Sequence, residues 1–327
     1  MSTQTENYDV LIAGQGAAAF AAGLYVARYQ MKSIIIGETF GGETATGGLI
    51  ENYPGYVGID GFDLMMKFRE QVASYDVPIV DDKVNNIKKE SKDFEIETES
   101  GEKYRAASVI LGIGRERRKL GLEHENEWTG KGVSFCSTCD APLHRDNVVA
   151  IVGGGNAAIE GAVLLSKYAS TVYLIYRRGE FTRPEPVNLK LLNESKNIIQ
   201  LVNTNVTSLI GDNGLSEISI DNPHNNSTKL SVDGLFIEIG ADPRIEIPLQ
   251  LQINLNEKNE VIVNNEMETN VEGVYAAGDI ALENINLNLL VTGVSQGTIA
   301  VNWAKHRVDP KSRVLPGHSS EKGIRHD

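Results

Sequence analysis

The sequence contains little of what marks secreted or membrane-spanning proteins. Only two of its 327 residues are cysteines, whereas a small secreted protein stabilised by disulfides would contain several cysteine pairs. No stretch approaches the roughly 20 apolar residues of a membrane span. The segment from Met1 to Asn7 is polar and lacks the basic and apolar pattern of a signal peptide. We therefore expect a cytoplasmic protein with no membrane partner.

Positive charge is also in the minority. The chain has 31 Lys and Arg residues against 44 Asp and Glu residues, which gives a formal net charge of −13. This imbalance argues against nucleic acid or an anionic membrane as the main partner. Because 327 residues are too many for one ordinary hydrophobic core, we expect two domains.

The two cysteines stand three positions apart, as Cys136-Ser137-Thr138-Cys139, and Asp140 follows them. A single C-x-x-C in an otherwise cysteine-free chain indicates redox chemistry, because one thiol can attack while the other resolves the mixed disulfide. Half of a zinc site and two incidental cysteines are the alternatives. Structural zinc usually takes four ligands, and the sequence offers no second C-x-x-C and no close histidine pair. We predict no metal site.

Two glycine-rich turns share one pattern, roughly 139 residues apart (153 − 14). Each follows a short apolar strand, reads G-x-G-x-x-A and opens a helix. The first glycine permits a tight turn, the second lets the backbone approach a pyrophosphate, and the last small residue lets helix and strand pack closely. The diphosphate then lies at the helix N-terminus, where free N–H groups favour negative charge. The predicted elements are strand 8–13, helix 20–29 and strand 33–36, and again strand 148–152, helix 159–168 and strand 171–176.

Each copy is followed by residues that read as antiparallel strands separated by a polar turn. They span 94–98 and 104–113 in the first half, and 215–221 and 229–239 in the second. More strand material follows at 261–263 and 273–279, and a final helix is predicted over 295–306. The sequence thus predicts an α/β protein with two Rossmann-like, three-layer dinucleotide-binding domains, each with an inserted β-meander.

Several segments, in this order, resemble the low-molecular-weight thioredoxin reductases over almost the whole chain. They are the first fingerprint, Gly41-Gly42 with Glu51-Asn52-Tyr53-Pro54-Gly55, the Cys136 to Asp140 segment, the second fingerprint with Glu160, Arg177-Arg178, and Ala276-Ala277-Gly278-Asp279. The resemblance implies the FAD/NAD(P)-binding fold, with an FAD-binding domain of residues 1–117 and 246–327. An NAD(P)H-type domain of residues 118–245, carrying the redox-active disulfide, would be inserted between them.

The same resemblance implies a homodimer in which electrons pass from NADPH to FAD, to the Cys136–Cys139 disulfide, and on to a thioredoxin-like protein. It also implies rotation of one domain against the other about thin connections near Arg117 and Ile245. Cys139 matches the cysteine nearest the flavin, and Cys136 matches the one that exchanges with thioredoxin. Asp140 matches the proton donor to the thiolate. Asp140 could instead cap the helix that follows it, and the two roles are compatible.

Cofactor-binding residues follow from the same matches. Those expected to bind FAD are Gly14, Gly16, Ala17, Ala18, Glu38, Gly41, Gly42, Asn52, Val84, Gly278, Asp279, Gln296 and Gly297. Glu38 is expected on the adenosine ribose and Asp279 on the ribityl chain. Gln296 and Gly297 are expected to open the final helix, whose N-terminus can stabilise negative charge on the flavin. Asn52 and Gln296 could instead serve a turn and a helix cap. Those expected to bind NADPH are Gly153, Gly155, Asn156, Ala157, Glu160, Arg177 and Arg178.

The sequence departs from the family at positions that concern the electron donor. An NAD site would carry an acidic residue at the end of its second strand, whereas Tyr176-Arg177-Arg178 stands here. The two arginines suit the 2′-phosphate of NADPH, or they form a solvated basic turn. Tyr176 replaces the family's histidine, Thr182 replaces a later arginine, and Asn288-Leu289 replaces an Arg-Gln pair near the flavin.

Four functions therefore stay open. The leading hypothesis is a FAD-dependent, thioredoxin-reductase-like disulfide oxidoreductase that takes electrons from NADPH. A second keeps the fold and takes electrons from another donor, such as a reduced ferredoxin or a deazaflavin. A third is a dithiol oxidase that forms a small-molecule disulfide and passes electrons to oxygen. The fourth is a flavin-bearing binding or sensor protein without turnover.

Overall fold

The computed structural model describes residues 6–46, 48–181, 184–282 and 287–314. The chain divides into two compact units. Unit 1 is built from both chain ends, Met1–Arg115 and Pro243–Asp327, and unit 2 from the segment between them, Glu116–Asp242. Each unit has hydrophobic core clusters of its own. The chain thus crosses between the units after Arg115 and after Asp242. The boundaries predicted from the sequence, after residues 117 and 245, lie two and three residues later.

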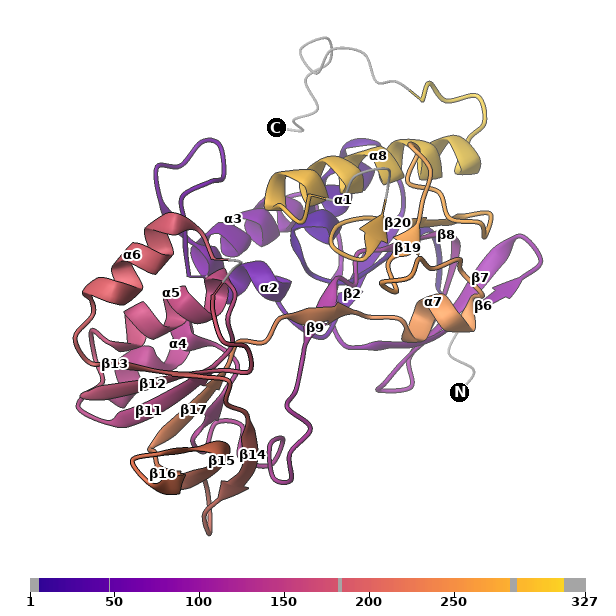
Figure 1. The fold of residues 1–327 in the computed structure, drawn as a ribbon. Coiled ribbons are helices and arrows are strands. Elements are labelled where there is room, and N and C mark those ends of the chain that lie inside the picture. Colours follow the sequence, from indigo (N-terminus) through magenta and orange to yellow (C-terminus); the bar gives the residue numbers. More distant parts are fainter. Residues whose placement is uncertain (1–5, 47, 182–183, 283–286, 315–327) are drawn as a thin grey trace. The chain divides into compact units, whose positions relative to one another are not determined.

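Unit 1 is organised around a seven-stranded sheet (Figure 1). Its strands run in the order β5-β2-β1-β8-β7-β6, and β20 also pairs with β8. Because β1 pairs in parallel with both β2 and β8, the first glycine-rich turn leaves the sheet at the carboxyl end of a central strand. The strands are β1 (Glu6–Ala13), β2 (Ser33–Gly37), β5 (Ile79–Asp81), β6 (Val84–Glu90), β7 (Asp93–Thr98), β8 (Lys103–Leu111) and β20 (Val274–Ala276).

Helices α1 (Ala17–Arg28) and α8 (Leu290–Val308) pack against each other in unit 1. Small residues allow this close approach: a Cβ atom at Gly297 would lie 2.2 Å from the backbone oxygen of Ala18. Helix α3 begins after Asp60, whose side chain accepts a hydrogen bond of 2.9 Å from the backbone N–H of Phe62. The other elements are α2 (Gly42–Ala45), β3 (Leu49–Ile50), β4 (Ile59–Asp60), α3 (Gly61–Ala73), α7 (Glu246–Gln250), β19 (Val261–Ile262) and β21 (Ala281–Leu282).

Unit 2 has three layers, because successive side chains along its strands point to opposite faces of the sheet and pack against a different layer on each face. Its five-stranded parallel sheet has the order β10-β17-β11-β12-β13. In β11, Val149 and Ile151 belong to the core cluster that contains residues of α5, whereas Ala150 and Val152 belong to the cluster that contains the meander. Figure 1 shows α5 on one side of this sheet and β14, β15 and β16 on the other. One strand therefore contributes to both cores.

The remaining bounds in unit 2 complete this architecture. The sheet consists of β10 (Val133–Ser134), β11 (Val148–Val152), β12 (Thr171–Tyr176), β13 (Ile198–Val202) and β17 (Gly234–Ile237). The meander consists of β14 (Val206–Ile210), β15 (Glu217–His224) and β16 (Ser227–Ser231). The helices are α4 (Ser137–Asp140), the 3₁₀ helix η1 (Ala141–His144), α5 (Asn156–Leu165) and α6 (Pro186–Glu194).

The two segments that connect the units form a sheet of their own, in which β9 (Arg115–Arg117) pairs with β18 (Ala241–Pro243). Each end of β9 is held within its own unit. In unit 1 the Arg115 guanidinium lies 2.5 Å from Glu260, and in unit 2 the Arg117 guanidinium lies 3.5 Å from Glu238.

The predicted fold class is confirmed, and several predicted boundaries are wrong. Helices α1 and α5 begin at Ala17 and Asn156, because the first helical turn already starts inside each fingerprint. The stretch predicted as one strand over 229–239 is two strands, one in the meander and one in the parallel sheet. Helix α8 begins at Leu290, five residues before the predicted start at 295. Within the described residues, no helix combines the length and apolar character needed to cross a bilayer.

Candidate functional site

The two cysteines form a disulfide at the start of a single helical turn in unit 2. Cys136 is the N-cap of α4, and its Sγ atom accepts a hydrogen bond of 3.1 Å from the backbone N–H of Cys139. The Ser134 hydroxyl accepts from the Cys136 backbone N–H at 3.0 Å, which holds the chain as it enters the turn. Cys139 is exposed and Cys136 is half-buried. The disulfide is therefore accessible to solvent on its Cys139 side.

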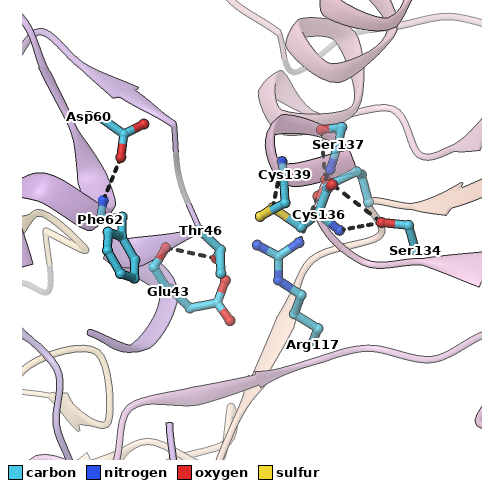
Figure 2. Close-up of a disulfide and its surroundings, with 10 residues drawn as sticks. Glu43, Thr46, Asp60, Phe62, Arg117, Ser134, Cys136, Ser137 and Cys139 are labelled. Atoms are coloured by element: carbon cyan, nitrogen blue, oxygen red, sulfur yellow. Dashed lines mark hydrogen bonds and ion pairs between the residues drawn. A yellow bond between two sulfur atoms is a disulfide. The ribbon is translucent and has the colours of Figure 1, made fainter. Parts of the chain in front are cut away.

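Beside this turn lies a charged pair, Glu238 and Arg117, that the sequence reasoning did not identify. Glu238 follows β17, and its carboxylate accepts from the Ser137 backbone N–H at 3.3 Å and from the Ser137 hydroxyl at 3.0 Å. The other carboxylate oxygen lies 3.5 Å from Nη1 of Arg117, whose guanidinium points toward the cysteines in Figure 2. Burial raises the pKa of Glu238 above its usual value, and Arg117 partly offsets that effect.

Asp140, the predicted proton donor, is the last residue of α4. Its backbone N–H bonds to the Cys136 carbonyl oxygen at 3.2 Å, which places it one turn beyond the first cysteine. Asp140 is also the residue preceding η1, yet its side chain makes no capping hydrogen bond there. The capping interpretation is therefore wrong. His144 closes η1, and burial lowers its pKa while Asp140 and Asp233 oppose that shift.

In unit 1 the first glycine-rich turn has the geometry of a phosphate cradle. A Cβ atom at Gly14 would lie 2.2 Å from the backbone oxygen of Gly112, so only glycine allows this packing. A Cβ at Gly16 would meet nothing within 4 Å, and one at Gly42 would meet only Gly16, at 3.6 Å. The turn is thus tight on one side and open on the other, where the first N–H groups of α1 begin.

A second group of predicted FAD residues adjoins this cradle through Ala18. The Gln296 side chain accepts from the Gly278 backbone N–H at 2.9 Å, and a Cβ atom at Gly278 would lie 3.1 Å from that of Ala18. Gln296 and Gly297 were expected to open the last helix, and this is wrong. They lie in the second turn of α8, where Gln296 is buried and Gly297 permits the contact with α1. Leu289, one of the two departing residues, is the N-cap of α8.

Asp279 follows the Gly278 turn and is surrounded by charged groups. The Arg115 guanidinium binds the Asp279 backbone oxygen at 3.1 Å and the Glu260 carboxylate at 2.5 Å. Burial raises the pKa of the Asp279 carboxyl, Arg115 opposes the shift, and Glu260 adds to it. Asp279 accordingly stands at the edge of the cradle with its charge only partly compensated.

The other predicted FAD residues are more scattered. Glu38 follows β2 and forms an ion pair with Arg244. Gly41 is the N-cap of α2 in a left-handed conformation (φ 68°). Asn52 is exposed, and Val84 is a buried residue at the start of β6. Ala17, by contrast, opens α1 directly beside the cradle.

The second glycine-rich turn, in unit 2, repeats the first. A Cβ atom at Gly153 would lie 2.2 Å from the backbone oxygen of Glu238, whereas one at Gly155 would meet nothing within 4 Å. Glu238 and Gly112 therefore occupy the same place in the two units, each directly after a strand that neighbours the fingerprint strand. Both units thus present a glycine-rich turn built in the same way, tight at its first glycine and open at its second.

Comparison with known proteins identifies the family. The profile of the pyridine nucleotide-disulphide oxidoreductases matches residues 8–301. The chain belongs to this family. A thioredoxin reductase of Mycolicibacterium smegmatis is 37% identical over 86% of this chain and 90% of its own length. The crystal structure of Lactococcus lactis thioredoxin reductase matches with a TM-score of 0.82 and 29% identity, over 92% of this chain and 99% of that one. That of T. acidophilum thioredoxin reductase matches with a TM-score of 0.78 and 32% identity, over 90% and 96%.

Family membership makes the protein a flavin- and nucleotide-binding oxidoreductase of the thioredoxin reductase type, with a redox-active cysteine pair. The sequence-based identification of this family is confirmed. No group of three or more His, Cys, Asp or Glu side chains suited to a metal ion occurs among the described residues.

In this family member an aromatic pair lies beside the second cradle. The Tyr176 ring is buried directly over Gly154, where a Cβ atom would lie 2.1 Å from the ring. Phe181 stacks on it, with ring centroids 5.0 Å apart and an interplanar angle of 13°. The end of β12, where an NAD site would place an acidic residue, is thus filled by stacked rings. Thr182 lies outside the described residues.

The other predicted nucleotide residues of unit 2 fall into two groups. Asn156 accepts hydrogen bonds from the Glu185 backbone N–H at 2.7 Å and from the Asn188 side chain at 3.2 Å. Asn188 also donates to Glu160 at 2.6 Å, so these predicted residues tie α5 to α6. Arg177, Arg178 and Ala157 are exposed and can reach a ligand.

The residues that sequence reasoning missed are Arg117, Glu238 and Ser137 beside the disulfide, and Arg115 and Glu260 beside Asp279. One feature of the sequence pointed to Glu238. Both halves end a strand at comparable points, and the second half has Glu238 where the first has Gly112. A charged residue in place of a glycine at a repeated strand end was the feature to examine.

Proposed function

We propose that unit 1 binds FAD and that unit 2 passes electrons through Cys136 and Cys139 to a thioredoxin-like protein. The observation that carries this proposal is the disulfide itself, formed within one helical turn of the unit that holds the second cradle. When bound, FAD supplies a two-electron carrier between the electron donor and the disulfide.

The residues of unit 1 fit FAD. Its cradle is open at Gly16, and the turn contains a buried acceptor atom that lacks a partner among the described residues, Oε1 of Gln15. The amide nitrogen of the same side chain already donates to the Gly37 backbone oxygen at 2.8 Å and to the Asp81 carboxylate at 2.7 Å. Such an orphaned buried acceptor is expected where a ligand donor binds. Asp279 would bind hydroxyl groups of the ligand at the other end of the cradle.

The protein's own residues carry the disulfide steps. In this proposal Cys139 exchanges electrons with FAD and Cys136 reacts with the protein substrate, as the family resemblance implies. Once the pair is reduced, the Cys136 thiolate attacks the substrate disulfide, a mixed disulfide forms and one substrate thiol leaves. The Cys139 thiolate then attacks Cys136, the Cys136–Cys139 bond forms again and the second substrate thiol leaves, so a proton must reach each sulfur that leaves. Asp140, one turn beyond Cys136 and free of a capping bond, is placed to supply that proton.

For the electron donor we propose NADPH, with a second candidate that one observation favours. Arg177 and Arg178 are exposed at the end of β12 and suit a 2′-phosphate, and the Gly155 cradle is open. The stacked rings of Tyr176 and Phe181, however, fill the position of the usual ribose ligand. They favour a donor other than NADPH, such as reduced ferredoxin or a deazaflavin.

An anaerobic titration of the flavin absorbance separates these candidates. We expect NADPH to bleach the flavin of the purified holoprotein at lower concentration than NADH, and the double variant R177Q/R178Q to remove this preference. Bleaching by dithionite but not by NADPH would establish the second candidate. Reduction of a thioredoxin by the reduced protein should be lost in C136S and in C139S. Turnover that survives both substitutions would contradict the disulfide proposal.

We also propose a cytoplasmic homodimer, by similarity to the thioredoxin reductases that the chain resembles. Sedimentation of the purified protein at several concentrations tests the dimer, since a monomer at all concentrations would contradict it.

A further inference from the structure

The charged pair beside the disulfide is built into the fold of unit 2. The Glu238 backbone N–H donates to the Val152 oxygen at 2.9 Å, and its own carbonyl lies against Gly153. Its side chain is only 12% exposed and turns the other way, to the Ser137 backbone and hydroxyl. Ser137 itself lies over Gly161 of α5. One residue therefore fixes both the second cradle and the turn that holds the two cysteines.

The comparison of the two units shows that this side chain is not required by the fold. Gly112 occupies the equivalent place in unit 1 and performs the backbone packing without any side chain. A buried carboxylate is costly unless it is paired and hydrogen-bonded. At Glu238 the pairing consists of Arg117 and two bonds to the residue between the cysteines. The buried carboxylate thus interacts with the redox turn through Ser137 and with β9 through Arg117.

Reduction of the disulfide changes the charge beside this pair. The Sγ–Sγ bond breaks, two electrons and one proton are taken up, and one thiol and one thiolate remain. The two electrons come from the reduced flavin of the proposed function. A cation close to the thiolate stabilises the reduced form and so raises the reduction potential, and an anion does the opposite. Arg117 and Glu238 therefore act on the same product with opposite sign.

We propose that Arg117 and Glu238 are positioning residues that together set the reduction potential of the Cys136–Cys139 pair, Arg117 through its cation and Glu238 through its charge and its hold on Ser137. This inference rests on the proposed disulfide function. Other ionisable groups around the turn within unit 2 are Asp140 at the end of α4, His144 in η1, and Asp233, which acts on His144 together with Asp140. These groups are the same in the wild type and in every variant of the test below.

The test is a redox titration of the full-length holoprotein in buffers of reduced and oxidised dithiothreitol. Free thiols are trapped by alkylation and counted by mass spectrometry, so that neither the electron donor nor a thioredoxin is required. We expect R117Q to lower the potential and E238Q to raise it. Each change should alter the equilibrium constant about tenfold, which corresponds to about 30 mV for two electrons. E238Q keeps an acceptor oxygen for Ser137, so that its effect reports charge.

Matched variants decide the interpretation. R117K should restore the wild-type potential, and it carries the test together with R117Q if E238Q does not fold. R118Q removes the neighbouring arginine, which pairs with Asp242 at the surface, and should leave the potential unchanged. Shifts of opposite sign support the inference. Absent shifts, or shifts of the same sign accompanied by lower stability, overturn it. Cysteines that do not titrate reversibly in the wild type would overturn the proposed function, and the inference with it.

Discussion

In unit 1 the charge of Asp279 is balanced by a neighbouring cation rather than by full exposure to water. Asp279 is half-buried, with Arg115 on its backbone oxygen and the Glu260 carboxylate on the same guanidinium. One cation thus serves two acids, and the two carboxylates repel each other. The pKa of Asp279 is raised as a result. A buried carboxyl with a raised pKa lowers stability at neutral pH, and such a cost is consistent with the FAD-binding role proposed for Asp279.

Asp279→Asn should make the protein without flavin more stable at neutral pH. A carboxyl whose pKa is higher in the folded state loses its stabilisation as pH rises from the unfolded value through the folded one. The amide cannot ionise, so the stability difference should be near zero below about pH 4 and grow toward about pH 7. Urea unfolding at several pH values measures it, and a difference independent of pH would contradict the argument. FAD binding should weaken in the same variant.

Pairs of elements meet closely where the sequence has glycine. In unit 2, Gly161 of α5 faces the redox turn, and a Cβ atom there would lie 2.6 Å from the Ser137 hydroxyl oxygen and 3.0 Å from the Ser137 Cβ. The distance between α4 and α5 is therefore set by the absence of one side chain. The position of the cysteines depends on this contact, because Ser137 lies between them.

Gly161→Ala tests this contact, because the contact reverses the expected sign of the change in stability. Inside a helix the change ordinarily stabilises by about 1 kcal/mol. Here the clash with Ser137 should reverse the sign and destabilise unit 2 by about 1–3 kcal/mol, while shifting the reduction potential of the disulfide. Urea unfolding and the thiol titration measure the two effects. A Cβ atom at Gly161 would also lie 2.8 Å from Cδ1 of Ile151, and S137G removes the hydroxyl that donates to Glu238. The double variant G161A/S137G should therefore recover only part of the stability.

At the scale of elements, much of the fold was predictable and the supporting residues were not. The periodicity of apolar residues, the G-x-G-x-x-A fingerprints and the turn residues predicted both βαβ units. Strands β11 and β12 have the predicted bounds. The start of α8 was missed because its N-cap position is occupied by Leu289, which has no capping side chain. Arg117 and Glu238 are 121 positions apart in the sequence, so only the folded sheet shows that they meet.

Taken whole, the chain is two units with independent cores joined by a pair of short strands. The anchors of these strands lie within the units: Arg115 with Glu260 and Arg244 with Glu38 in unit 1, and Arg117 with Glu238 in unit 2. Each unit therefore holds its own end of the connection. This arrangement is suited to the inter-domain rotation that the family resemblance implies.

A fragment of residues 116–242 should fold alone, because it is continuous and contains both layers that cover its sheet. We expect a single cooperative urea transition and a disulfide that titrates as in the full chain. Circular dichroism and the thiol titration measure these properties. A matched fragment of residues 1–115 should fail to fold cooperatively, because it lacks β20 and α8. A cooperative transition in that fragment would contradict the argument.

The contact between α1 and α8 has a consequence for the time course of synthesis. The two helices end at Arg28 and Val308, 280 residues apart (308 − 28). At typical elongation rates of about 5–20 residues per second, α1 waits on the order of 15–55 s for its partner. Unit 2 emerges complete during that interval. The newborn chain thus lacks the α8 partner of α1 for most of its translation, and apolar surface exposed in this way is prone to aggregation.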